Sequence, residues 1–165
     1  MNTENENTLR GLFAADRERR QNAMSEEERK NRDVERDMLT FAAIREEIIK
    51  PELDEIAHFV RSEGWDSVVA VENEKDIRKD VPSTPTIVIY FSEGKVSPFT
   101  PEREAYVRFG CVAGYSKVSV SESNILDGRG GSSGSGTTVD MTKITGIWVN
   151  DRVTKLVAEL LKNAV

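Results

Sequence analysis

The spacing of apolar residues changes from helical to strand-like along the chain, and then back again. Apolar side chains recur at helical spacing over residues 38–60, and Pro51 interrupts this stripe without ending it. Ser25 and Glu28 have the spacing of a capping box, which marks the start of a helix. We therefore predict one long helix over residues 25–63, with a solvated first half and a kink at Pro51.

The next part of the chain has the alternation and composition of β-strands. Five runs rich in β-branched or aromatic residues cover residues 66–72, 86–92, 105–112, 115–122 and, in a shorter run, 137–144. Strands that follow one another so closely favour an antiparallel meander, with a tight hairpin at Ala113 and Gly114. Residues 127–136 are mostly glycine and serine, have nothing to bury, and predict a mobile loop.

Helical spacing of apolar residues returns over residues 147–163. This segment predicts a C-terminal amphipathic helix packed on one face of the sheet. The whole order is a helix, an antiparallel sheet of four to five strands across residues 66–144, and a second helix. It predicts an α+β fold that forms one domain over residues 25–165.

Residues 1–24 differ from the rest because they are polar and offer few groups to bury. We predict a flexible arm there. Leu9, Leu12 and Phe13 are exceptions, spaced as on one face of a helix. Two interpretations remain open: these side chains enter a groove on another chain, or they fold back on their own domain.

Charge and composition restrict the possible partners. The chain has 23 Lys and Arg against 29 Asp and Glu, a formal net charge of −6, which disfavours non-specific binding to nucleic acid or anionic membranes. No segment approaches the roughly 18 apolar residues of a membrane span. The N-terminal segment also lacks the basic and apolar regions of a signal peptide. A cytoplasmic protein without a membrane partner is expected.

Few residues in the sequence offer catalytic chemistry. Cys111 and His58 are the only cysteine and the only histidine. They could pair as a nucleophile and its base, but a buried strand cysteine and a helix-surface histidine are the interpretation we prefer. The acids of residues 72–80 are interleaved with Lys and Arg, and the glycine-rich stretch lacks the lysine of a phosphate-binding loop. We predict no catalytic residue, metal site or cofactor.

These features predict a non-enzymatic protein-binding, adaptor or chaperone-like module that acts through self-association, with a homodimer expected, and through docking to a protein partner. The residues expected to bind the partner lie on the arm: Leu9, Leu12, Phe13, Arg17 and Arg20. Neighbouring acids nearly cancel the charge of these arginines, which disfavours nucleic acid as the partner.

Two alternatives belong to other functional classes. The first is a small-ligand binder or enzyme with a pocket between sheet and helices. Its candidate lining residues are Tyr90, Tyr106, Arg108 and Glu122. The second is an acidic mimic of nucleic acid, because residues 51–100 hold twice as many acids as bases.

Overall fold

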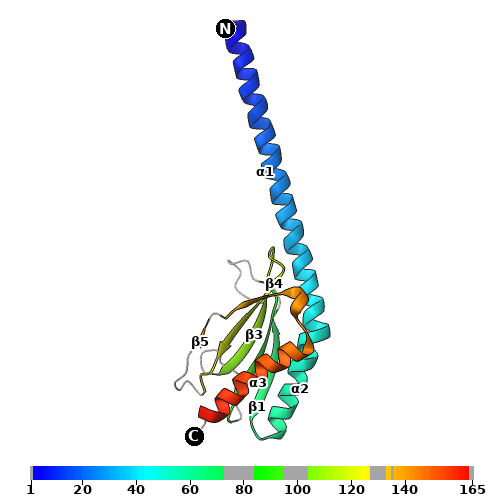
Figure 1. The fold of residues 1–165 in the computed structure, drawn as a ribbon, viewed down its shortest axis with the longest axis vertical. Helices are drawn as coiled ribbons and strands as arrows, with labels where there is room; N and C mark the ends of the chain where they lie inside the picture. Colours follow the sequence, from blue (N-terminus) through cyan, green and yellow to red (C-terminus); the bar gives the residue numbers. More distant parts are fainter. Residues whose placement is uncertain (1, 73–83, 95–103, 127–132, 135, 164–165) are drawn as a thin grey trace.

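A long helix, an antiparallel sheet and a C-terminal helix make up the protein (Figure 1), which confirms the predicted α+β class. The computed structural model describes residues 2–72, 84–94, 104–126, 133–134 and 136–163. The first half of the long helix projects away from the body, while its second half and the C-terminal helix lie against the sheet. One end of the molecule is therefore a single bare helix.

The long helix consists of α1 (Thr3–Ile44), a π-helical turn η1 (Arg45–Ile49) and α2 (Lys50–Ser62). It begins at Thr3, so the predicted start at Ser25 is wrong. The side chain of Asn2 caps the helix by accepting a hydrogen bond from the amide of Asn5 at 2.8 Å. Ion pairs between successive turns, such as Arg10 with Glu6 at 2.7 Å, support the helix without any apolar face. The flexibility of residues 1–24 stays a prediction.

The π-helical turn lies just before Pro51 and has a local cause. A proline has no N–H to donate, and its ring crowds the preceding turn of an α-helix. The backbone N–H of Lys50 donates to the carbonyl of Arg45, five residues back, which is the hydrogen bond of a π turn. The chain changes direction at this point in Figure 1 and continues to Ser62, in agreement with the predicted kink.

The four main strands form an antiparallel meander in the order β1 (Asp66–Glu72), β2 (Thr86–Ser92), β3 (Ala105–Val112) and β4 (Lys117–Ser123). The first three strands have the predicted bounds. The fourth begins at Lys117 rather than residue 115, because the connection is a four-residue turn over 113–116 and not a tight hairpin. Ser116 in this turn has a φ of 53°, a left-handed conformation that a non-glycine residue rarely adopts.

Two short strands complete the sheet, since β5 (Ser133–Gly134) and β6 (Thr138–Asp140) both pair with β4. The predicted fifth strand over 137–144 is therefore shorter, and its second half is the 3₁₀ turn η2 (Met141–Lys143). Of the predicted mobile loop over 127–136, residues 127–132 and 135 lie outside the described part of the chain.

The hydrophobic core lies between one face of the sheet and the helices α2 and α3 (Gly146–Asn163). Val107, Phe109 and Val120 project from the sheet into this layer and are fully buried. The ring of Trp148 meets Phe109 edge-on at 6.0 Å, which holds the first turn of α3 against β3. The α3 helix matches the predicted range of 147–163.

The carboxylate of Asp37 fixes the long helix to the turn between β3 and β4. It is nearly buried and accepts three hydrogen bonds of 2.8 Å, from the backbone N–H groups of Gly114 and Ser116 and from the Ser116 hydroxyl. Burial raises the pKa of Asp37, but these hydrogen bonds and the nearby Arg36 outweigh it, so the pKa lies below its ordinary 3.8. Ser116, with its left-handed backbone, lies in the turn that points the backbone N–H groups of Gly114 and Ser116 toward the carboxylate.

Replacing Asp37 by Asn removes the charge that these donors solvate, and we expect it to reduce the free energy of unfolding by about 1–3 kcal/mol at pH 7. Because the folded-state pKa is depressed, the ionised carboxylate stabilises the fold above about pH 3.8 and loses this effect as pH falls through the lower folded-state value. Urea unfolding of both chains at pH 7 and pH 3 measures this. The difference in free energy of unfolding between the wild type and Asp37→Asn should be smaller at pH 3 than at pH 7.

Asp33→Asn is the matched control, because Asp33 lies one turn earlier and, within the described part of the chain, makes only a surface ion pair with Arg36 at 3.3 Å. Its effect should stay below about 1 kcal/mol. An Asp37→Asn effect that is equally small, or that does not change with pH, contradicts the proposed stabilisation by the ionised group.

Candidate functional site

The structure separates the four residues predicted to line a pocket. Tyr90, Tyr106 and Arg108 share the sheet face that points away from the helices, since Tyr90 pairs with Tyr106 across β2 and β3 and Arg108 lies two residues further along β3. Glu122 is on the opposite face, where its carboxylate forms an ion pair of 3.0 Å with Arg152 of α3. These four residues do not line one site.

The three residues of the outer face form a packed polar cluster. The rings of Tyr90 and Tyr106 meet edge-on at 6.2 Å, and the guanidinium of Arg108 lies 4.8 Å from the centre of the Tyr106 ring. Burial and then the charge of Glu72 raise the pKa of Tyr90, more than Arg108 lowers it. Tyr90 is thus a weaker acid than usual and stays neutral at physiological pH, which does not favour a role in proton transfer.

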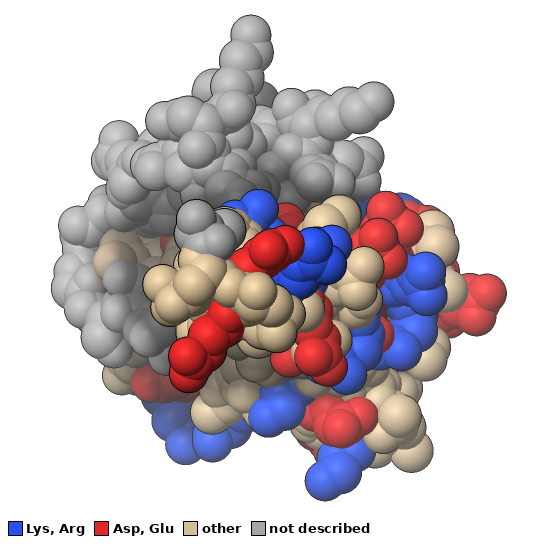
Figure 2. Space-filling model, turned by 90° about the horizontal axis from the view of Figure 1, so that it is seen from above, with Lys and Arg blue, Asp and Glu red and all other residues tan. Residues whose placement is uncertain are grey.

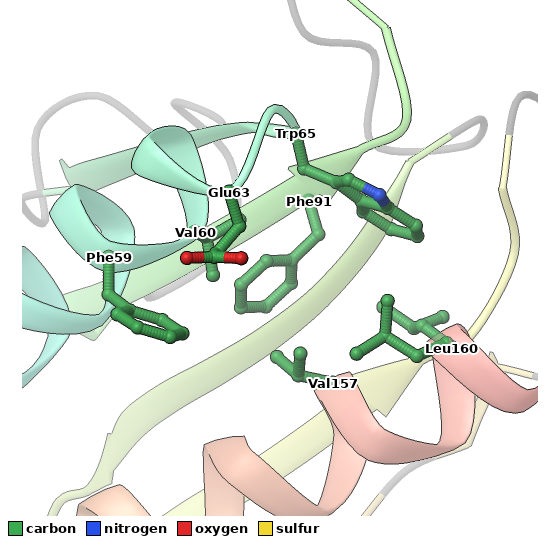
Figure 3. A pocket seen from close by; sticks show the side chains of 8 residues that line it. Phe59, Val60, Glu63, Trp65, Phe91, Val157 and Leu160 are labelled. Carbon is green, nitrogen blue, oxygen red and sulfur yellow. The ribbon is translucent and has the colours of Figure 1, made fainter.

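A cavity of about 340 Å³ lies between the C-terminal halves of α2 and α3. Phe91 of β2 forms its floor, and Phe59 and Leu161 stand at its rim, 63% and 56% exposed. In the view of Figure 3 the carboxylate of Glu63 lies between the rings of Phe59 and Phe91, and Trp65 and Leu160 lie beside them. The lining is mainly apolar with one acidic group, which suits an apolar partner.

A second hollow of about 280 Å³ continues this cavity along the seam between the two helices. Both share Phe59, Val60 and Val157, so we treat them as one surface and call it the α2–α3 groove. Towards the start of α2, Glu55 lines the hollow. Glu52, one turn earlier, accepts a hydrogen bond of 3.4 Å from the side-chain amide of Asn150 of α3. The α2 side of the groove is therefore acidic along its length.

The sequence analysis missed this groove, although Phe59 gave a signal. The apolar stripe of α2 follows Ile49, Leu53, Ile56 and Val60, and Phe59 falls outside it. A large aromatic residue off the core-facing stripe of a helix is expected to stay partly exposed. The partners of Phe59 in the groove come from β2 and α3, far away in the sequence, so no pattern within α2 could identify them.

The structure places the predicted partner-binding residues on the projecting part of α1. Leu9, Leu12 and Phe13 are 43%, 63% and 64% exposed, so they do not fold back on their own domain. Arg17 and Arg20 follow them on the same helix. Arg20 pairs with Asp16 at 3.0 Å, whereas Arg17 forms no ion pair within the described residues and donates only to the carbonyl of Phe13.

The structure does not support a nucleophile pair of Cys111 and His58. Cys111 is buried in the core, and burial, assisted by the charge of Asp37, raises the pKa of its thiol to about 11. His58 is exposed on α2 and no hydrogen bond joins it to Cys111 in the part of the chain that the structure describes. A thiol with such a high pKa is a poor source of thiolate.

We expect Cys111 to react slowly with a thiol reagent at pH 8 while the protein is folded. Burial and a pKa of about 11 should make the reaction at least about 100-fold slower than in denaturant. Stopped-flow labelling of the folded and the unfolded chain measures the ratio. An added cysteine at exposed Ala15 is the control and should react at the unfolded rate; fast labelling of Cys111 itself in the folded state would show that the thiol is not shielded.

Known proteins give no guide to the function: no family model, curated protein or solved structure matches the chain.

Within the described residues, no group of three or more His, Cys, Asp and Glu is placed to hold a metal ion. Glu74, Asp76 and Asp80 of the acidic segment lie outside those residues. None of the described helices is long and apolar enough to cross a membrane. Two surfaces of the described residues that could bind a partner are the projecting helix and the α2–α3 groove.

Proposed function

We propose that this chain is a non-enzymatic protein-binding module that associates with itself and docks a protein partner through its projecting helix. The observation that carries the proposal is the exposure of Leu9, Leu12 and Phe13 at the far end of a helix that extends well beyond the body. Large apolar side chains grouped on a polar surface are typical of protein interfaces.

The stability of a bare helix supports the same proposal. Residues of α1 before Asp37 are exposed or partly exposed, so packing against the body contributes little to this segment. Helices in water gain most of their stability from packing of an apolar face, and local ion pairs add only about 0.2–0.5 kcal/mol each. A partner that covers this segment would supply the missing packing. Assembly with a partner would therefore explain why the helix is longer than one small domain needs.

The α2–α3 groove favours a second candidate, a binder of small apolar molecules. The part of the groove over Phe91 has a volume of about 340 Å³, at the lower end of known ligand pockets, and Phe59, Trp65 and Phe91 provide aromatic surface. Saturable binding of an apolar fluorescent dye that Phe59→Ala abolishes would support this candidate. The described residues that line the groove are mainly apolar, whereas an enzyme of this kind needs several polar groups close together. The groove therefore supports ligand binding better than catalysis.

The acidic-mimic hypothesis has less support from the sequence of its segment, where Lys75, Arg78 and Lys79 are interleaved with the acids. Figure 2 shows Lys and Arg side chains interspersed with Asp and Glu on the face that is seen from above. A mimic of nucleic acid needs a regular array of negative charge, which interleaved cations disrupt.

Self-association predicts that replacing Leu9, Leu12 and Phe13 together by Gln lowers the solution mass of the full-length chain from a dimer to a monomer. Gln forms helices well, so α1 should persist while its apolar anchors are lost. Light scattering over a range of concentrations measures the mass, and circular dichroism checks the helix content.

Leu39→Gln is the matched control, since Leu39 is 74% exposed on the same helix but lies outside the projecting segment. Its mass should remain that of the wild type. A wild-type chain that is monomeric at every concentration contradicts self-association, and a dimer that survives the triple substitution contradicts the role of the anchors.

A further inference from the structure

The charged residues that line the α2–α3 groove are all acidic. Among the described residues that border either part of it, Glu55 and Glu63 carry a negative charge and none is a Lys or an Arg. The other lining residues are mainly apolar, so little in the groove itself offsets the two carboxylates. By charge complementarity, the groove favours a ligand that carries a positive charge over a neutral or an anionic one.

The carboxylate of Glu63 is available to such a ligand. Its side chain forms neither an ion pair nor a hydrogen bond within the part of the chain that the structure describes. Arg61, the nearest cation in the sequence, donates instead to the backbone carbonyl of Ser67 at 2.8 Å. Figure 3 shows the Glu63 carboxylate at the apolar cavity, between the rings of Phe59 and Phe91. Glu63 is thus placed to act as the counter-ion of a cation in the cavity.

Aromatic side chains border the same cavity. Phe59 is 63% exposed, Trp65 is partly buried, and the fully buried Phe91 forms the floor beneath them. None of these three rings makes an aromatic contact with another ring of the described residues, so they are not packed on one another. The face of an aromatic ring attracts a cation, most strongly when the ring belongs to Trp. Aromatic rings grouped around a site are the usual means of recognising a quaternary ammonium group.

The number of hydrogen-bond acceptors decides which kind of ammonium the cavity suits. A primary ammonium has three N–H donors, and each donor that leaves water without finding an acceptor destabilises the complex. Among the side chains of the described residues that line the cavity, only that of Glu63 is an acceptor. A quaternary ammonium has no N–H donor, and its carbon substituents can pack on apolar side chains. The cavity therefore suits a quaternary better than a primary ammonium.

We propose that the α2–α3 groove binds a hydrophobic organic cation, a quaternary ammonium that carries an apolar chain. This inference rests on the second candidate function, the binding of small apolar molecules, and specifies the class of ligand. The ammonium lies against the rings of Phe59 and Trp65, with Glu63 as its counter-ion. The apolar chain lies along the seam between the helices, on Val157 and Leu161, where the second hollow of about 280 Å³ extends the cavity.

Calorimetric titration of the full-length chain with four ligands of equal chain length tests the class of ligand. The ligands are octyltrimethylammonium, octylammonium, 1-octanol and octanoate, each below the concentration at which it aggregates. We expect saturable binding of octyltrimethylammonium with a Kd at least about fivefold lower than those of octylammonium and octanol, because only the quaternary cation gains the ring and carboxylate contacts without burying N–H donors. Octanoate should bind most weakly of the four, since Glu63 repels it.

Two conservative substitutions test the site. Glu63→Gln removes the charge but keeps the size of the side chain, and Phe59→Leu removes the ring but keeps an apolar group. Each should raise the Kd of octyltrimethylammonium about three- to fivefold and leave that of octanol within about twofold. Phe59 is well exposed, so the fold should tolerate the change. Asp54→Asn is the matched control, because Asp54 is exposed on α2 and is not among the residues that line the groove. It should leave both Kd values unchanged.

The outcomes separate this inference from the proposed functions. Equal Kd values for octyltrimethylammonium and octanol overturn the preference for a cation and leave the groove as a site for apolar molecules. Octylammonium that binds as tightly as the quaternary cation overturns the preference for a quaternary group. An effect of Asp54→Asn as large as that of Glu63→Gln also overturns the inference, because it shows general attraction to an acidic protein. If none of the four ligands binds saturably, the second candidate function fails as well, whereas self-association is decided separately by the solution mass.

Discussion

The hydrogen bonds of Asp37 to the turn between β3 and β4 determine where the body ends and the projecting helix begins. Three donors converge on this one carboxylate, two from the backbone of Gly114 and Ser116 and one from a hydroxyl. A nearly buried carboxylate tolerates loss of water only when such donors replace it. With this contact in place, the segment of α1 that follows packs on the sheet and the segment before it extends into solvent.

A second polar contact positions the other half of the long helix. Arg45, in the π-helical turn, is buried and donates to the backbone carbonyls of Glu72 and Thr86 at 3.3 and 3.4 Å. It thereby joins the helix to the adjacent ends of β1 and β2. Asp37 and Arg45 hold the helix at two points, two turns apart, and the bend at the π-helical turn directs α2 along the sheet. This placement of α2 beside α3 creates the groove that we propose as the ligand site.

The exposed aromatic side chains and the hydrophobic core occupy separate parts of this molecule. The core side chains Val107, Phe109 and Val120 are fully buried, whereas Phe13 and Phe59 are well over half exposed. Covering such side chains would contribute favourable free energy, in proportion to the apolar area removed from water. The charges of α1 alternate in sign along the helix, and Arg17 forms no ion pair within the described residues.

The sequence by itself determined the elements and the class of the fold. The bounds of β1, β2, β3 and α3 follow from the spacing of apolar residues, because that spacing must match the period of the element that buries them. It did not reveal that the helix begins at Thr3, since caps and ion pairs rather than an apolar face support that segment. Leu9, Leu12 and Phe13 were visible as anchors because they interrupt a polar sequence.

Tertiary structure alone decided which residues share a surface. Tyr106 and Glu122 were grouped from the sequence, yet the register of β3 and β4 places them on opposite faces, and a shift of one residue would exchange those faces. The α2–α3 groove joins Phe59, Phe91 and Leu161 from three separate elements. Periodicity reports which side of an element is buried, but contacts between elements depend on how helices and strands pack in three dimensions. The exposed apolar residues of α1 could therefore be found in the sequence, whereas the α2–α3 groove exists only in the folded chain.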